Sequence, residues 1–268
     1  MAAGLFPRQE KHPAWGSVKI VRQMRHWGPN LVVLAGWLCA QWAAAQVVHQ
    51  LTPVPQPTGS YVVFKFDWDQ GVPWVRYSIA VDDAGNTHFE GVGNPGENGD
   101  NDSFTENFTM SDINRLKIFE LAKKANYFQG NLEAKSKNLA KTGQKTLEYH
   151  GKSPDGGQTV TGSATYNYSP NTDVEELTRL FQAIATTLDF GRKLAFQYRF
   201  DKLGMDARLK SLQDLQASHY AEEMQAIEPI LQKIASDPNM MHINRVTAKQ
   251  LLNSASPTAA QGQPADQP

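Results

Sequence analysis

Cysteine is almost absent from this sequence, and the only one lies in a segment that we expect to be removed. That residue is Cys39, in an apolar run near the N-terminus of the 268-residue chain. Without Cys39 the chain has no thiol nucleophile, no disulfide and no cysteine-ligated zinc site. The sequence also lacks a G-x-S-x-G serine motif, a P-loop and a G-x-G-x-x-G nucleotide motif. These absences remove several enzyme classes from consideration.

The apolar run is the centre of a predicted export signal. Arg25 supplies a basic start, Leu31–Ala40 is apolar, and Ala43–Ala45 ends the segment with small residues. These are the three parts of a secretory signal peptide. The stretch is shorter than the roughly 20 apolar residues of a transmembrane helix. We therefore predict cleavage after Ala45, no lasting membrane span, and a mature protein in the periplasm or outside the cell.

Residues 1–45 thus form the predicted signal peptide, and Met24 is our preferred start of translation. The alternative is that the residues before Met24 belong to a long basic start. Loss of residues 1–45 leaves 21 basic and 26 acidic residues and lowers the net charge from −1 to −5. Nucleic-acid binders and polybasic membrane binders both need a basic surface, so we expect neither kind of partner.

Composition and periodicity divide the remaining chain into four segments. Residues 46–59 are a Pro-rich linker, and residues 254–268 are a polar tail that we expect to be disordered. Between them we predict an α+β domain over 60–190 and a helical extension over 191–253. The fold class is α+β: an antiparallel sheet of about five strands with one inserted helix, then about three to four helices.

Alternation of apolar and polar residues marks the strands. The turn Asp82–Asn86 offers Gly85 for a positive φ, so the strands around it form a hairpin. A second hairpin pairs residues 145–150 with 159–168. The expected core positions of the first two strands are Val62, Phe64, Phe66 and Trp68, then Val75, Tyr77, Ile79 and Val81.

Caps and breakers mark the helices. Ser111 is the expected N-cap of the inserted helix, and Thr172-x-x-Glu175 is a capping box for the next one. Pro229 kinks the later helical pattern or starts a new helix, and Asp237-Pro238 breaks it. The inserted helix should bury the stripe Ile113, Leu116, Phe119 and Ala122.

Charge is divided unevenly along the middle of the chain. Residues 82–112 hold eight acidic and no basic residues, whereas 115–145 hold eight basic and two acidic ones. Such blocks either create a dipolar surface that steers partners or neutralise each other side by side. Within the acidic block, Glu97, Asp100 and Asp102 have the composition of a calcium loop. The EF-hand spacing is not met, and a polar turn is the alternative. We predict no other cofactor.

Three further groups of residues are candidates for function. Asp67 and Asp69 share a strand face, where paired carboxylates act as acid and base or are plain surface charge. His88 and His150 lie on predicted strands that could bring them together, although their spacing is not that of a metal pair. The helical half carries a Tyr- and Met-rich series that is either core or a face for a partner: Tyr198, Phe200, Met205, Tyr220, Met224, Met240 and Met241.

Two local motifs lie in the predicted α+β domain. Asp83–Gly91 has the pattern D-x-G-x-x-x-x-x-G, and Ala125–Phe128 ends a helix as A-x-Y-F. With the strand Thr142–Tyr149, they resemble an uncharacterised family of exported bacterial proteins of the acidobacterial type. The resemblance covers residues 60–190 and implies the fold and export, but no activity.

The first functional hypothesis is therefore an exported, non-enzymatic module that binds a protein or a cell-envelope component. The alternative is a periplasmic hydrolase or metal-dependent enzyme that uses carboxylates of segment 82–112. A third hypothesis is an assembly protein that forms a self-dimer through its helical half. An envelope protein or a second copy of the chain is the expected partner.

Overall fold

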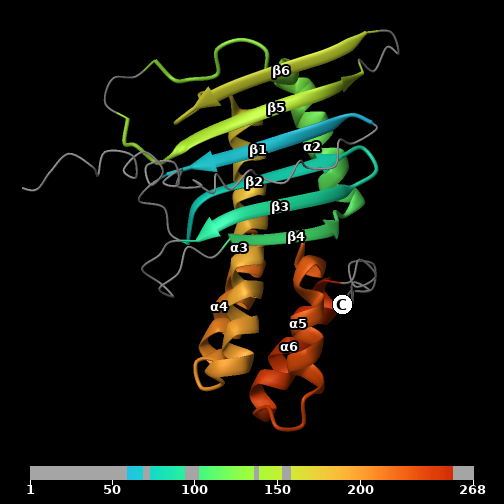
Figure 1. The fold of residues 1–268 in the computed structure, drawn as a ribbon, viewed down its shortest axis with the longest axis vertical. Coiled ribbons are helices and arrows are strands. Elements are labelled where there is room, and N and C mark those ends of the chain that lie inside the picture. Colours follow the sequence, from blue (N-terminus) through green and yellow to red (C-terminus); the bar gives the residue numbers. More distant parts are fainter. Residues whose placement is uncertain (1–58, 69–72, 94–102, 136–138, 153–157, 256–268) are drawn as a thin grey trace, which may run out of the picture. The chain divides into compact units, whose positions relative to one another are not determined.

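Six antiparallel strands form one sheet in the computed structural model, with the order β4-β3-β2-β1-β5-β6 (Figure 1). The structure describes residues 59–68, 73–93, 103–135, 139–152 and 158–255, all within one compact unit. The predicted signal, the linker and the tail beyond residue 255 lie outside the described residues. The strands are β1 (Tyr61–Asp67), β2 (Trp74–Asp82), β3 (Asn86–Gly93), β4 (Ser103–Thr109), β5 (Gln144–Lys152) and β6 (Thr159–Tyr166).

The helical segments lie after β4 and after β6, which confirms the α+β class with the sheet in the N-terminal half. None of the described helices is long and apolar enough to cross a membrane. The segments are α2 (Asp112–Lys124), η1 (Asn126–Phe128), α3 (Thr172–Phe200), α4 (Met205–Ala217), η2 (Met224–Ile227), α5 (Glu228–Ser236) and α6 (His242–Ala255).

The first hairpin is confirmed, and one core position in it differs. Gly85 has a φ of 88° between β2 and β3. A register irregularity between Trp74 and Arg76 turns Trp74 into the core and leaves Val75 only half-buried. A bulge adds one residue to the alternation, so a strict period of two places the residues before it on the wrong face.

Strand β4 was not predicted. It pairs with β3 at the edge of the sheet, and Glu106 lies opposite the buried Phe89. The core-facing positions of β4 are therefore Phe104, Glu106 and Phe108, and the central carboxyl interrupts their apolar pattern. Burial raises the pKa of Glu106. An inward-facing charge on an edge strand discourages pairing with another chain.

Helix α2 begins as predicted but buries a partly different face. The Ser111 side chain caps it by accepting a hydrogen bond from the Asn114 amide, at 3.4 Å. The expected stripe is half right: Ala122 is buried and Phe119 packs partly buried against the core. Ile113 and Leu116 are exposed, and the helix buries Ile118 and Leu121 in their place. Apolar residues stand on two adjacent faces of α2, and their spacing alone does not decide which face meets the sheet.

The capping box of α3 is displaced by one residue. The N-cap is Asn171, whose side chain accepts from the amides of Asp173 and Val174. Glu175 accepts from the Ser169 amide at 3.2 Å, outside the helix. The boundaries of α5 follow prediction, since Pro229 stands in its first turn and the helix ends before Asp237-Pro238.

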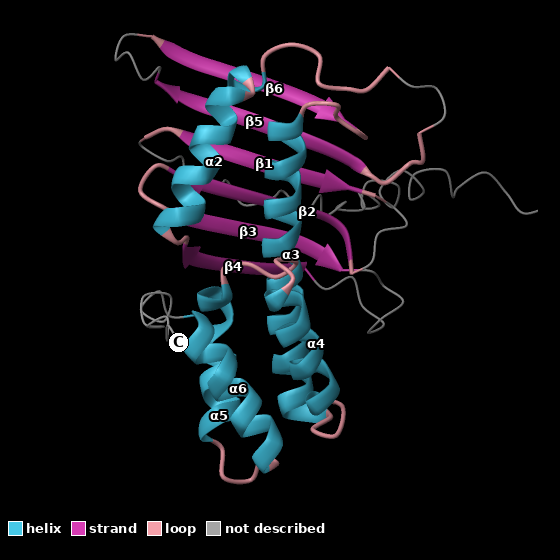
Figure 2. Ribbon diagram, turned by 180° about the vertical axis from the view of Figure 1, so that it is seen from behind, coloured by secondary structure: helices cyan, strands magenta, loops and turns pink. Residues whose placement is uncertain are grey.

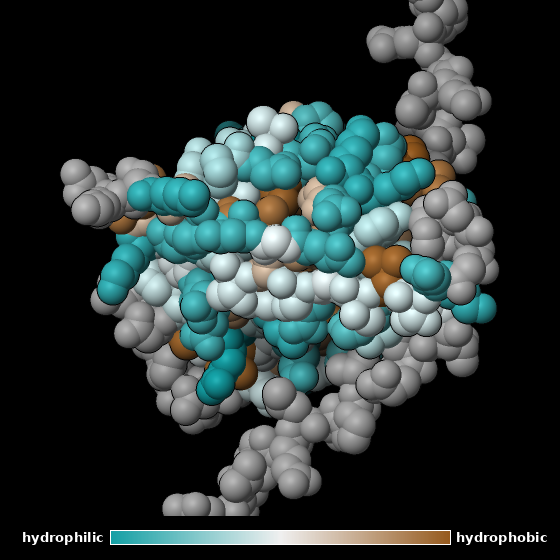
Figure 3. Space-filling model, turned by 90° about the horizontal axis from the view of Figure 1, so that it is seen from above, coloured by the Kyte–Doolittle hydropathy of each residue, from teal (hydrophilic) through white to brown (hydrophobic). Residues whose placement is uncertain are grey.

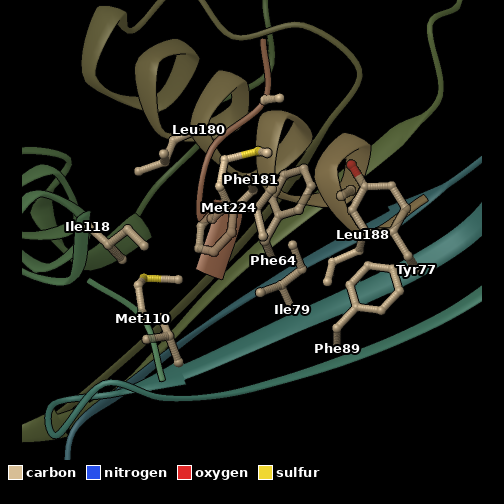
Figure 4. Packing of buried hydrophobic residues seen from close by; sticks show 14 of the residues in the cluster. Phe64, Tyr77, Ile79, Phe89, Met110, Ile118, Leu180, Phe181, Leu188 and Met224 are labelled. Carbon is tan, nitrogen blue, oxygen red and sulfur yellow. The ribbon is translucent and has the colours of Figure 1, made fainter. Parts of the chain in front are cut away.

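Helix α3 packs on the same face of the sheet as α2, and its first half provides much of the core (Figure 2). Phe181 stacks on Phe64 of β1 with ring centroids 5.1 Å apart. Trp74 of β2 donates its indole N–H to the Ala185 carbonyl at 3.1 Å. Figure 4 shows Phe64 and Phe181 among aliphatic and methionine side chains from strands and helices. One continuous core therefore joins sheet and helices.

The second half of α3 packs against the other helices. Gln197 accepts a hydrogen bond from the Arg208 guanidinium of α4 at 2.9 Å, and the Tyr198 hydroxyl donates to Asp237, just after α5, at 3.1 Å. The boundary expected near residue 190 falls inside α3. The helical extension is thus attached to the sheet by an uninterrupted helix.

The opposite face of the sheet is polar. Lys65 pairs with Glu148 at 2.7 Å, and Thr146 contacts Thr165 at 2.9 Å on the neighbouring strand. Seen from the end at which β6 lies, hydrophilic and neutral side chains dominate the described surface (Figure 3). The sheet face away from the helices thus has the composition of the solvated side of an antiparallel sheet.

Buried tyrosines predict a loss of stability in alkali. Burial raises the pKa of Tyr77 and of Tyr166 far above the usual value. The two tyrosines make their full contribution to the free energy of unfolding below the unfolded-state pKa of about 10, and this contribution is lost as the pH rises above it. We expect the urea midpoint to fall above about pH 10.

The matched variant is Tyr166→Phe. Thr178 already donates to the Val174 carbonyl, so the Tyr166 hydroxyl donates to Thr178, at 2.6 Å. Removing that bond should cost about 1 kcal/mol at neutral pH and make the alkaline fall shallower. A variant curve that falls as steeply as the parent's would contradict this assignment.

Candidate functional site

The predicted site residues do not form one site in the described part of the chain. Glu97, Asp100, Asp102 and Asp69 lie outside it, and Asp67 stands exposed at the end of β1. No group of three or more His, Cys, Asp or Glu residues there is placed to hold a metal ion. The calcium loop therefore stays a prediction.

The two strand histidines share the polar face of the sheet without meeting. His88 is on β3 and His150 on β5, with β2 and β1 between them. The ring of His88 contacts the Asn107 side chain at 2.7 Å, and that of His150 stacks on Tyr61 at 4.8 Å. Each therefore has a local partner on a neighbouring strand.

A groove beside α2 is the candidate site, and sequence reasoning did not find it. Two adjoining hollows of about 470 and 540 Å³ share His219 and Glu222, so we treat them as one and call it the α2 groove. It lies between α2, α3 and the turn 218–223 that follows α4. The lining includes Ser111, Ile113, Asn114, Lys117, Glu176, Arg179, Tyr220 and Glu223.

A buried carboxylate lines the groove and joins the turn 218–223 to the start of α2. Glu223 is 4% exposed, with one oxygen accepting from the Ser111 hydroxyl and the Asn114 side-chain amide, each at 2.6 Å. Its other oxygen accepts from the Ser111 amide at 2.8 Å and from the Gln225 side chain. The carboxylate thus lies at the N-terminus of α2, where backbone N–H groups and the helix dipole favour negative charge.

The backbone of Glu223 adopts a conformation that a non-glycine residue rarely takes. Its φ is 60° and its ψ is 48°, in the left-handed region. The left-handed backbone conformation costs about 1–2 kcal/mol of conformational free energy. The four hydrogen bonds that the Glu223 carboxylate accepts readily offset this cost. This strained residue aims a side chain at Ser111, more than a hundred positions earlier in the chain. Nothing in the local sequence signals that pairing.

Charges along the groove are mostly paired. Lys117 of α2 contacts Glu176 of α3 at 2.7 Å, and this hydrogen bond lowers the pKa of Glu176. His219 contacts Glu222 at 3.2 Å. Arg179 has no ion-pair partner among the described residues. In the described groove, the guanidinium of Arg179 therefore lies beside two pairs of residues that already contact each other, Lys117 with Glu176 and His219 with Glu222.

Exposed large apolar side chains lie on α2 and on the turn that borders the groove. Of the two on α2, Ile113 lines a hollow and Leu116 does not. Ile113 is 76% exposed and Leu116, one turn later on α2, is 61% exposed. Tyr220, which lines the other hollow, is also exposed. The Ser111 hydroxyl donates a hydrogen bond to Glu223 and accepts one from the Asn114 amide, so it serves the helix cap. The described groove thus combines exposed apolar side chains with a buried carboxylate whose oxygens both accept hydrogen bonds.

Comparison with protein-family models, with curated proteins and with solved structures finds no match to this chain.

Exchange of the buried carboxylate tests whether it holds α2 in place. In Glu223→Gln an amide replaces one oxygen and faces two donors, so we expect a loss of about 1–3 kcal/mol in the free energy of unfolding. Urea denaturation measures it. Glu222→Gln makes the same change one residue earlier, where the partner is an exposed histidine, and should cost less than about 0.5 kcal/mol. Equal losses would contradict the role of Glu223.

Proposed function

We propose that this chain is an exported, non-enzymatic module that binds a protein through the α2 groove. The observation that carries the proposal is the exposure of Ile113 and Leu116 on the outward face of α2. Both side chains belong to a rigid helix, and one of them lines a hollow. Exposed apolar side chains grouped beside polar residues are typical of protein-binding surfaces.

The chemistry of the groove indicates the kind of segment that would bind. Apolar side chains of a partner would cover Ile113 and Leu116 and enter the adjoining hollows. An acidic residue of the partner would pair with Arg179, which has no such contact among the described residues. Opposite charge at the margin of an interface mainly gives specificity and faster association.

The groove is well suited to binding because its walls are fixed before a partner arrives. Glu223 ties the turn 218–223 to the start of α2, and Lys117 ties α2 to α3. A preorganised surface loses little conformational entropy on binding, so more of the contact energy appears as affinity.

The enzyme alternative has no specific support in the described carboxylates of segment 82–112. Asp82 accepts hydrogen bonds from the amides of Ala84 and Asn86, and Asp112 pairs with Arg115. These groups hold a turn and a helix start. Glu106 faces the core side of an edge strand.

Export is the part of the proposal that rests on sequence. The basic start, apolar centre and small-residue end around Ala45 support it. When the gene is expressed in a bacterium that secretes such proteins, N-terminal sequencing of the accumulated chain should begin at Gln46. Ala45→Arg should block cleavage at this position. A parent chain that retains residues 1–45 would contradict a cleaved signal.

Substitution of the exposed apolar pair tests the binding surface. Ile113→Asp with Leu116→Asp should abolish capture of an envelope protein on the immobilised chain, while thermal unfolding stays close to that of the parent because both sites are exposed. Phe200→Asp with Leu203→Asp, which changes exposed apolar residues elsewhere, is the control and should retain capture.

A photoactivatable residue at position 116 should cross-link to the captured protein, whereas one at position 203 should not. Equal capture by the parent and the groove variant, or cross-linking only at 203, would remove the α2 groove as the binding surface.

A further inference from the structure

Five of the ten exposed large apolar residues in the described part of the chain gather at one end of the helical extension. Phe200 is 72% exposed and Leu203 is 85% exposed, and the other three are each close to half exposed. We call this group the helical tip: Phe196, Phe200 and Leu203 around the α3–α4 turn, with Met241 and Ile243 around the α5–α6 turn.

The two turns are held at the same end of the helices. The Tyr198 hydroxyl and the Lys202 ammonium of the first turn both reach Asp237 of the second, at 3.1 and 3.5 Å. Figures 1 and 2 show both turns at the ends of the helices remote from the sheet. Phe196 and Phe200 also contact each other, with ring centroids 5.0 Å apart. The two turns that carry the exposed side chains are therefore held together at this end of the helices.

The charges around this group have both signs. Arg199, Asp201 and Asp206 are exposed, and none has an ion-pair partner among the described residues. An anionic lipid surface attracts patches of basic residues, and the carboxylates of Asp201 and Asp206 would be repelled by it. A surface that carries both signs can face a copy of itself across a two-fold axis, and Arg199 of one chain would then pair with Asp201 of the other.

The apolar area of the tip also fits self-association. The five exposures amount to about three fully exposed large side chains, or roughly 450–600 Å². A standard interface buries about 800 Å² per partner, of which about 65% is apolar in homodimers, or about 520 Å². The tip therefore supplies the apolar part of a small two-fold interface.

We propose that the helical tip is a homodimer interface, with Phe200 and Leu203 at its centre and reciprocal Arg199–Asp201 pairs at its margin. This interface shares no residue with the α2 groove. It does not depend on the proposed function, which concerns a different partner on a different surface.

Sedimentation equilibrium of the full chain tests the interface. Over a range of micromolar concentrations the mean mass should rise from the monomer value of 29.8 kDa toward twice that value. Phe200→Asp with Leu203→Asp should weaken dimerisation at least about tenfold without changing thermal unfolding. Ile113→Asp with Leu116→Asp is the control and should dimerise like the parent. Residues 1–45 are common to all three chains, so they do not account for a difference.

Charge reversal tests the margin. Arg199→Asp and Asp201→Arg should each weaken dimerisation, because like charges meet across the axis. An equal mixture of the two chains should restore it, since each introduced charge then faces its opposite.

Three results would overturn the proposal. One is a parent that stays monomeric throughout, and another is a mixture that associates no better than either single variant. The third is binding of the parent, but not of the tip variant, to anionic phospholipid vesicles, which would make the tip a lipid-binding surface.

Discussion

Helix α3 is the element on which the rest of the structure depends. Its first half is buried against the strands through contacts such as Phe181 on Phe64, and its second half is buried against α4 and α5. Strands and helices thus share one core, and neither half could separate without exposing part of α3. Most of the stability of a helix in a protein comes from its tertiary packing. Because α3 packs on the sheet with one half and on the other helices with the other half, the sheet and the helical extension stabilise each other through it.

Glu223 provides a second connection, and its consequence reaches the surface. The buried carboxylate binds the N-terminus of α2 and so fixes both the position and the rotation of that helix. In this rotation Ile118 and Leu121 face the core, and Ile113 and Leu116 face outward. The apolar pair is exposed because the helix is anchored at its end. A polar contact in the interior therefore determines which residues a partner would meet.

The sequence sufficed where one local signal decided the structure. Gly85 in its turn and Pro229 at a helix start both follow from short-range stereochemistry. Prediction failed where a distant contact chose between local options. The rotation of α2, the edge strand β4 around Glu106 and the bulge beside Trp74 are of this kind. The α2 groove was missed for the same reason, since Ser111 and Glu223 are 112 positions apart in the chain.

The two proposed surfaces are independent in a way that matters for binding strength. The α2 groove is built on contacts between α2, α3 and the turn 218–223, whereas the helical tip is built on the ends of α3 and α5. A dimer joined at the tips would carry two unobstructed grooves, because no groove residue contributes to the two-fold contact. If the partner is itself repeated on an envelope surface, the second groove would bind at a high effective concentration, and the two weak contacts together would hold far more tightly than one. Modest affinity at each groove is then enough, which agrees with a shallow site that has only a few apolar anchors.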